Sequence, residues 1–234
     1  MLLFKIAPFL FTIMRFDIIT IFPSLFTPFL KESLVKRALE DGLITVNIHD
    51  LRKWTTDPHK TVDDKPFGGG SGMVMKAEPI YKAVTDIKKD SGGKGTKVIL
   101  FTPRGKRFNQ KKAADFSEYQ QIIMICGRYE GIDERVAKHI ADEKISIGNY
   151  VLMGGEFPAM IVTETVSRLA PGVVGKKEFL EERKKKEGFV EYPQYTKPES
   201  ITVDGIKRKV PKILLSGNHE EIKKWKDKKG KIIK

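Results

Sequence analysis

Apolar and polar positions divide the beginning of the chain into strand-like and helix-like segments. Residues 15–22 are rich in Ile and Phe and end at Pro23, which predicts a buried strand. Apolar positions then recur at helical spacing over residues 25–39, and Gly42 is suited to end that helix. Residues 43–51 predict a second strand. This region therefore has the pattern of a β-α-β unit with a short crossover.

Three further strand-like segments each run into a turn that contains glycine. They cover residues 97–103, 122–131 and 144–155. Helix-like stretches lie before, between and after these strands, at 78–87, 107–118, 132–141 and from about Pro158 to Leu169. Alternating strands and helices predict an α/β fold, with a parallel sheet and helices on both of its faces.

The three glycine-bearing turns predict one shared pocket, because ligands of such sheets bind beyond the carboxyl ends of the strands. Its expected lining is Phe101, Thr102, Pro103, Gly127, Tyr129, Glu130, Gly131, Ile147, Gly148, Tyr150, Leu152, Gly154 and Gly155. This lining is apolar and acidic rather than basic, and it matches neither the P-loop nor the dinucleotide-binding pattern. We therefore expect a nucleoside-like ligand without phosphates.

A glycine-rich segment at residues 59–75 is a poor helix or strand. It holds four glycines and the adjacent carboxylates Asp63 and Asp64. Two interpretations stay open: a flexible surface loop, or a mobile loop whose backbone closes on a ligand.

Composition adds a polyanionic partner to this picture. The 234 residues carry a net charge of +13, and the last quarter, from Lys176 on, has 18 basic and 10 acidic residues. Nucleic acid is the favoured partner, although a solubility surface or the lysine enrichment of thermophiles gives the same excess. The single cysteine, Cys126, indicates a reducing cytoplasm, and the four scattered histidines give no metal-ligand spacing.

The chain is expected to have four parts. Residues 1–13 are read as an N-terminal extension, because Pro8 interrupts an apolar stretch too short to span a membrane. Residues 14–175 form the main domain with the predicted pocket, and the charged segment 176–188 is a linker or lid. Residues 189–234 form a small basic helical unit suited to contact with a phosphate backbone, with a helix beginning near Asn218.

Seven motifs in sequence order resemble those of a known family. They are DIITIFP, TVDDKPFGGGSGMVM, CGRYEGIDERV, SIGNYVLMGGEFPAM, VSRLAPGVVG, EYPQYTKPE and LLSGNHEEI. From Met14 to about Trp225 the chain resembles the bacterial tRNA (guanine-N1)-methyltransferases, the TrmD family of the SPOUT superfamily. The third and fourth motifs are specific as a pair.

The resemblance implies a SPOUT-type main domain with a C-terminal trefoil knot, in an obligate homodimer with active sites at the subunit interface. It also implies methylation of N1 of guanosine 37 in tRNA, next to the anticodon, with S-adenosylmethionine as the methyl donor. Mg²⁺ takes part in many family members, but no residue cluster here identifies a site. The implied cofactor contacts are Leu100, Phe101, Thr102, Gly127, Tyr129, Glu130, Gly131, Ser146, Ile147, Gly148, Asn149, Tyr150, Val151, Leu152, Gly154, Gly155 and Pro158.

Methyl transfer to guanine N1 needs a base for the N1 proton and a donor for the charge that develops on O6. By resemblance Arg168 supplies the donor, Glu130 helps to hold the cofactor, and Asp63 is associated with the tRNA. The family's acidic linker position is Arg183 here, and arginine cannot act as a base at neutral pH.

Three alternatives therefore stay open for the base. Glu182, next to Glu181, takes the role after a one-residue slip, or water or phosphate takes it, or catalysis is impaired. A non-catalytic RNA-binding protein and a methyltransferase for another RNA position are the competing functions. The C-terminal segment is short for the family, which predicts a weaker grip on tRNA that its lysines partly offset.

Overall fold

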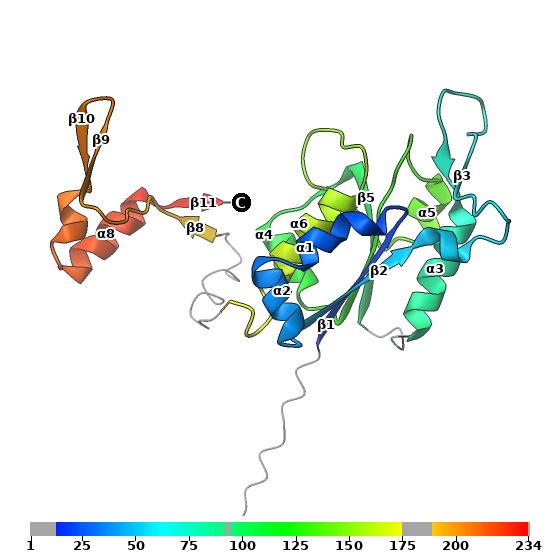
Figure 1. The fold of residues 1–234 in the computed structure, drawn as a ribbon, viewed down its shortest axis with the longest axis horizontal. Helices are drawn as coiled ribbons and strands as arrows, with labels where there is room; N and C mark the ends of the chain where they lie inside the picture. Colours follow the sequence, from blue (N-terminus) through cyan, green and yellow to red (C-terminus); the bar gives the residue numbers. More distant parts are fainter. Residues whose placement is uncertain (1–12, 91, 93–94, 175–188, 234) are drawn as a thin grey trace, which may run out of the picture.

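The computed structural model describes residues 13–90, 92, 95–174 and 189–233 (Figure 1). The predicted extension 1–13 is therefore outside it except for Ile13, and so is the whole predicted linker, 176–188, with Glu181, Glu182 and Arg183. The proposed domain boundaries remain predictions.

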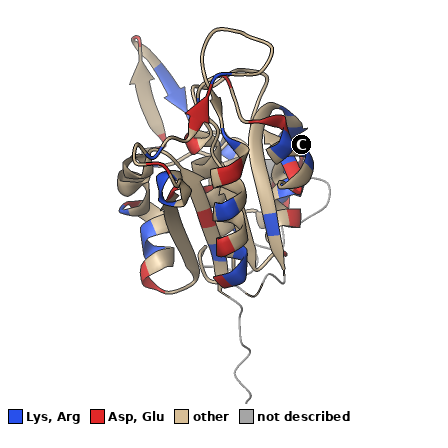
Figure 2. Ribbon diagram, turned by 90° about the vertical axis from the view of Figure 1, so that its right-hand side faces the viewer, with Lys and Arg blue, Asp and Glu red and all other residues tan. Residues whose placement is uncertain are grey.

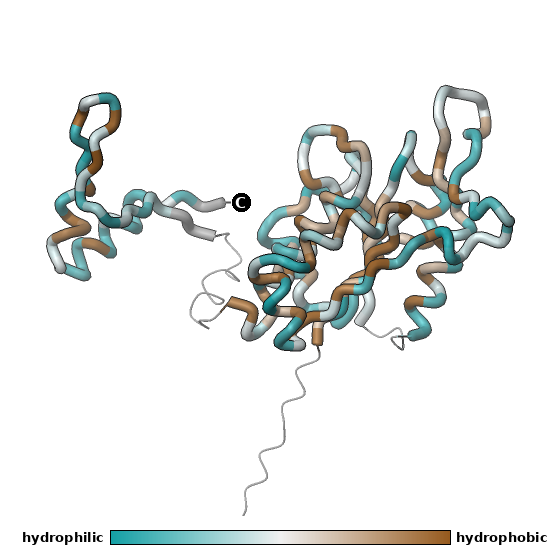
Figure 3. The backbone as a smooth tube through the Cα atoms, viewed as in Figure 1, coloured by the Kyte–Doolittle hydropathy of each residue, from teal (hydrophilic) through white to brown (hydrophobic). Residues whose placement is uncertain are grey.

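A five-stranded parallel sheet forms the centre of the described chain. Its order is β2 (Ile44–Asp50), β1 (Met14–Thr20), β6 (Gln121–Ile125), β5 (Thr96–Arg107) and β7 (Glu143–Ser146). The parallel α/β sheet predicted from the alternating pattern is thus confirmed. Apolar residues concentrate along these strands, as their burial on both faces requires (Figure 3).

Helices cover both faces of the sheet. On one face lie α2 (Ser33–Glu40), α4 (Gln110–Phe116) and α6 (Glu156–Ser167), packed on a core that contains Phe16 and Met124. On the other face lie α3 (Ala77–Asp90), α5 (Glu134–His139) and the 3₁₀-helix η2 (Leu51–Trp54). The outward side of α3 carries acidic and basic residues (Figure 2).

Four predicted elements differ from the observed ones. The helix expected over 25–39 is divided into η1 (Pro23–Phe26), α1 (Thr27–Leu30) and α2, because Glu32 is extended and Ser33 has a φ of +58°. The strands expected to reach residues 131 and 155 end at Ile125 and Ser146, and the glycines that follow form turns. Strand β5 runs past Phe101, leaves β7 over residues 102–105 and pairs with it again at Lys106.

Two-residue strands β3 (Asp63–Asp64) and β4 (Val74–Met75) pair at the base of the glycine-rich loop. In the C-terminal part, α8 (His219–Lys229) begins after Asn218 as predicted, with the Asn218 side chain accepting a hydrogen bond from the Glu221 amide. The other C-terminal elements are the 3₁₀-helix η3 (Lys212–Leu215) and the antiparallel pairs β8 (Phe189–Glu191) with β11 (Lys231–Ile233), and β9 (Ser200–Val203) with β10 (Ile206–Lys209). These strands were not predicted.

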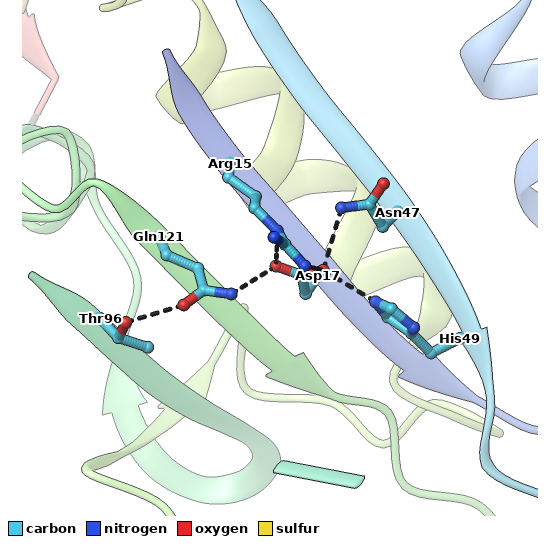
Figure 4. Close-up of polar contacts among 6 residues, drawn as sticks. All are labelled: Arg15, Asp17, Asn47, His49, Thr96 and Gln121. Carbon is cyan, nitrogen blue, oxygen red and sulfur yellow. Dashed lines mark hydrogen bonds and ion pairs between the residues drawn. The ribbon is translucent and has the colours of Figure 1, made fainter. Parts of the chain in front are cut away.

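A buried carboxylate, Asp17, joins three strands in the half of the sheet that lies away from the glycine-bearing turns (Figure 4). It accepts hydrogen bonds from Arg15 on β1 (2.7 and 2.9 Å), from Asn47 (3.1 Å) on β2 and from Gln121 (2.7 Å) on β6. His49 on β2 lies 2.8 Å from the same carboxylate. Burial opposes ionisation of Asp17, but these partners outweigh it and lower its pKa to about 2.

Candidate cofactor-binding site

A pocket of about 340 Å³ lies at the carboxyl ends of β6 and β7 and beside residues 100–104 of β5, where that strand leaves β7. The single pocket predicted from the three turns is therefore present among the described residues. Its lining is Leu100, Phe101, Thr102, Pro103, Arg104, Gly127, Arg128, Tyr129, Glu130, Gly131, Ile132, Glu134, Ala137, Lys144, Ile145, Ser146, Ile147, Gly148, Tyr150, Val151, Leu152, Met153, Gly154, Gly155 and Pro158. Every residue expected to contact a cofactor lines it except Asn149.

Glycine is required where the turn after β7 crosses the turn after β6. The Gly155 amide donates a hydrogen bond to the Gly127 carbonyl (2.9 Å). A Cβ atom on Gly155 would lie 2.6 Å from the Cα of Cys126, which real structures do not show. The glycines of SIGNYVLMGGEFPAM thus allow two main-chain segments to form adjacent walls of the pocket.

The prediction that acidic residues outnumber basic ones in the pocket lining is wrong. Arg104, Arg128 and Lys144 line the pocket together with Glu130 and Glu134. Two of these cations are paired, because Arg104 lies 3.0 Å from Glu134 and Arg128 lies 3.0 Å from Glu156. The sequence carried a signal for Arg128, which stands inside the motif CGRYEG between two predicted contacts. Spacing alone gave none for Arg104, Glu134 or Lys144.

The turn after β6 also contacts the glycine-rich loop. The Glu130 amide donates to the Met73 carbonyl (3.0 Å), and the Met75 amide donates to the Gly131 carbonyl (3.0 Å). Tyr129 has a φ of +59°, an unusual conformation for a non-glycine residue, and its side chain faces Asp63. Burial first, and then the charge of Asp63, raise the pKa of Tyr129. The structure thus brings Asp63 to the edge of the predicted cofactor site.

Arg168 does not line the predicted cofactor pocket. It follows the last residue of α6 and lines a second cavity, of about 190 Å³, between the α1–α2 region and α6. Its guanidinium has no hydrogen-bond or ion-pair partner within the described part of the chain. The neighbouring Ser167 hydroxyl is buried and also unpaired there. Glu182, the candidate base, lies outside the described residues.

Two features are absent from the described residues. None of the helices in these ranges is both long and apolar enough to cross a bilayer. No group of three or more His, Cys, Asp or Glu side chains in the same ranges is arranged to hold a metal ion.

Comparisons with known proteins agree on one family. A sequence model described as tRNA (Guanine-1)-methyltransferase TrmD matches residues 14–232. The chain is 51% identical to a tRNA (guanine-N(1)-)-methyltransferase of Dictyoglomus turgidum, over 92% of this chain and 84% of the relative. It is 47% identical to the protein of the same name from Clostridioides difficile, over 91% of this chain and 90% of the relative.

A solved structure agrees as well. It is the crystal structure of a tRNA (m1G37) methyltransferase from Aquifex aeolicus, matched with a TM-score of 0.73 at 40% identity over 91% of this chain and 87% of that one. The fold, the pocket and these relatives lead to one conclusion: the chain belongs to the TrmD family of tRNA (guanine-1)-methyltransferases.

Proposed function

We propose that this protein transfers a methyl group from S-adenosylmethionine to N1 of guanosine 37 in tRNA. Family membership supports the reaction, and the solved relative is named for the same product, m1G37. The observation that carries the proposal is the pocket at the ends of three adjacent strands, which gathers all but one of the expected cofactor contacts. S-adenosylmethionine, when bound, supplies an electrophilic methyl group on a positively charged sulfur.

The residues of the pocket fit such a ligand. Its volume of about 340 Å³ is within the usual range for small-molecule sites, and Leu100, Phe101 and Ile147 offer apolar surface for a planar base. The close crossing at Gly155 lets main-chain segments without intervening side chains form part of the pocket wall. Glu130 is the lining carboxylate without an ion-pair partner in the described chain, so we propose that it attracts the cationic end of the cofactor.

The proposed role of Arg168 requires a second copy of the chain. Arg168 follows the C-terminal end of α6, whereas Gly155 and Pro158 line the pocket at the N-terminal end. The helix has 12 residues, and at about 1.5 Å per residue its ends lie about 18 Å apart. An Arg168 that donates to O6 of the base in this pocket must therefore come from a partner subunit whose α6 runs in the opposite direction.

Exposed apolar side chains on and before α6 support the homodimer. Phe157 and Ile161 are 61% and 41% exposed and lie one helical turn apart. Val151 and Met153, in the turn that precedes the helix, are 82% and 86% exposed. Apolar groups that gather next to a ligand pocket are typical of subunit interfaces.

The remaining residue roles are proposed from the family resemblance. We propose that Asp63 and the glycine-rich loop contact the tRNA, that the lysines of 189–234 contact its phosphates, and that Glu182 accepts the N1 proton. The trefoil knot is proposed from the family resemblance. A cytoplasmic location is proposed from the tRNA substrate and the unpaired Cys126. Participation of Mg²⁺ stays a prediction from the family.

One assay tests the function. The protein is incubated with methyl-labelled S-adenosylmethionine and unmodified tRNA carrying guanosine at position 37, or the same tRNA with adenosine there. We expect label only in the first tRNA, and digestion to nucleosides should identify 1-methylguanosine. Retained tRNA binding without turnover would favour the non-catalytic RNA-binding protein. Methylation of another nucleotide would favour a methyltransferase that acts on another RNA position.

Glu182→Gln tests the base separately. If Glu182 accepts the N1 proton, this variant loses turnover while tRNA binding remains. Unchanged turnover would reject the assignment and leave water or phosphate as the acceptor.

A further inference from the structure

A fully buried carboxylate lies directly behind the pocket wall. Glu156, the first residue of α6, has no exposed surface and does not line the pocket. It accepts a hydrogen bond from the Thr20 hydroxyl at the end of β1 (2.9 Å) and one from Nε of Arg128 (3.0 Å). Arg128 does line the pocket. Glu156 is therefore hydrogen-bonded to a residue of the pocket wall, without lining the pocket itself.

Packing fixes the Arg128–Glu156 pair in this place. A Cβ atom on Gly154 would lie 2.3 Å from Nε of Arg128 and 2.5 Å from the Glu156 carboxylate, so only glycine leaves room for the pair. The Phe22 ring lies 4.7 Å from the guanidinium and covers it. The thiol of Cys126 also senses the pair, since burial first and then the charge of Glu156 raise its pKa well above the usual value.

The charge of Arg128 matters because of the ligand's own charge. S-adenosylmethionine carries a positive sulfur, which an uncompensated guanidinium in the pocket wall would repel. In a partly buried site two charges several ångströms apart still interact appreciably. Glu156 offsets the Arg128 charge in a buried pair, whereas the Arg104–Glu134 pair is exposed to solvent.

We propose that Glu156, acting through Arg128, sets the preference of this pocket for the positively charged methyl donor over its neutral product. When the methyl group passes from sulfur to guanine N1, the sulfur keeps the bonding electron pair and becomes a neutral thioether, and the N1 proton leaves to the base. The affinity of the neutral product therefore depends less on whether Glu156 offsets the charge of Arg128. Glu156 is a positioning residue in this scheme, since it does not touch the ligand, and the inference rests on the proposed function.

Two substitutions shift this preference in opposite directions. Glu156→Gln keeps the shape and an acceptor for Arg128 but leaves the guanidinium charge uncompensated. We expect it to weaken S-adenosylmethionine about tenfold relative to S-adenosylhomocysteine, a difference of about 1.4 kcal/mol. Arg128→Met leaves a negative charge behind the wall and should move the ratio toward the sulfonium ligand. The double variant, which buries no unpaired charge, should return the ratio to the wild-type value.

Isothermal titration calorimetry of both ligands with the four proteins measures this ratio without turnover. Asp17→Asn is the matched control, because it neutralises a buried carboxylate of the same sheet away from the pocket, and its ratio should equal that of the wild type. Equal weakening of both ligands in Glu156→Gln and Arg128→Met would reduce the pair to a structural role and overturn the inference, while the proposed function stands. A wild-type protein that binds neither ligand would instead overturn the proposed function.

Discussion

Two buried carboxylates of this domain, Asp17 and Glu156, are each paired with an arginine, yet their surroundings differ. Asp17 is held by four side chains from three strands, in the half of the sheet away from the pocket (Figure 4). Glu156 has two partners, Thr20 and Arg128, and the second of these lines the pocket. A carboxylate whose partners all lie away from the pocket contributes to stability, whereas we propose that one whose charged partner lines the pocket also influences the field that a ligand meets.

The largest effect should come from removing the close approach that places Glu156 behind the pocket. Gly155→Ala puts a methyl group 2.6 Å from the Cα of Cys126, so the main chain must move. We expect loss of S-adenosylmethionine binding and a fall of about 3 kcal/mol in the free energy of unfolding, measured by calorimetry and chemical denaturation. Gly42→Ala is the control for cofactor binding: its Cβ would meet nothing within 4 Å, but its φ of +66° strains an alanine, so stability should fall while binding is retained. Cofactor binding retained by Gly155→Ala would contradict the crossing.

Arg168, whose guanidinium has no partner among the described residues, extends the comparison because we expect it to affect only the reaction. Arg168→Ala is expected to lower kcat by about 10²–10³-fold, as for other donors to a developing oxyanion, with unchanged affinity for S-adenosylmethionine. Single-turnover kinetics and calorimetry separate the two quantities.

Mixing this variant with Glu130→Ala, a defect on the pocket side, tests where Arg168 acts. Reassembled heterodimers recover activity only if the arginine of one subunit serves the pocket of the other. No recovery from mixed dimers would place both groups in one chain's site.

Asp17→Asn should act on stability alone. The pKa of Asp17 is lowered from 3.8 to about 2, so its ionised form contributes about 2 kcal/mol to the free energy of unfolding. This contribution is present above pH 4 and is lost as the pH falls through about 2. The stability difference between wild type and variant should therefore shrink in denaturation series taken from pH 7 down to pH 2. A difference independent of pH would show that the carboxylate's charge is not what matters.

The smallest effect is expected from charges that face solvent. Lys207 and Lys209 lie on one side of the β9–β10 hairpin and are exposed. The logarithm of the tRNA association constant falls linearly with the logarithm of the salt concentration. If each lysine contacts one phosphate, replacing either by Ala makes this slope less steep by about 1. Fluorescence anisotropy with labelled tRNA at several salt concentrations measures the slope, and Lys36→Ala on α2 is the control. An unchanged slope would remove the hairpin from the tRNA-binding surface.

The strands and the pocket were predictable because their signals are local. Residues 15–22 and 122–125 are apolar enough to require burial, and glycines after three such strands indicate turns that meet at one edge. The ends of the strands were missed, since Val151 and Leu152 are apolar but belong to an exposed turn. Their exposure follows from the subunit and ligand contacts we propose for that turn, which the periodicity of one chain does not encode.

Pairings between distant charged residues were not predictable. Arg128 and Glu156 are 28 positions apart, and nothing in their spacing selects one partner over another. Asp17 interrupts an apolar run, which is a sign of a buried polar group, but its partners come from three strands and appear only when the register is known. The β9–β10 hairpin did carry a local signal, because Asp204 and Gly205 form a two-residue turn between Val203 and Ile206. Strands β8 and β11 lie far apart in the sequence and carried none.

The main-chain bonds between the glycine-rich loop and the turn at 129–131 have a thermodynamic consequence. Met73 and Met75 hold the same turn whose other side forms a wall of the pocket. A ligand that orders the loop also lowers the cost of ordering that wall, and a ligand in the pocket does the same for the loop. Linkage then requires reciprocity: the factor by which one ligand strengthens the binding of the other is the same in both directions.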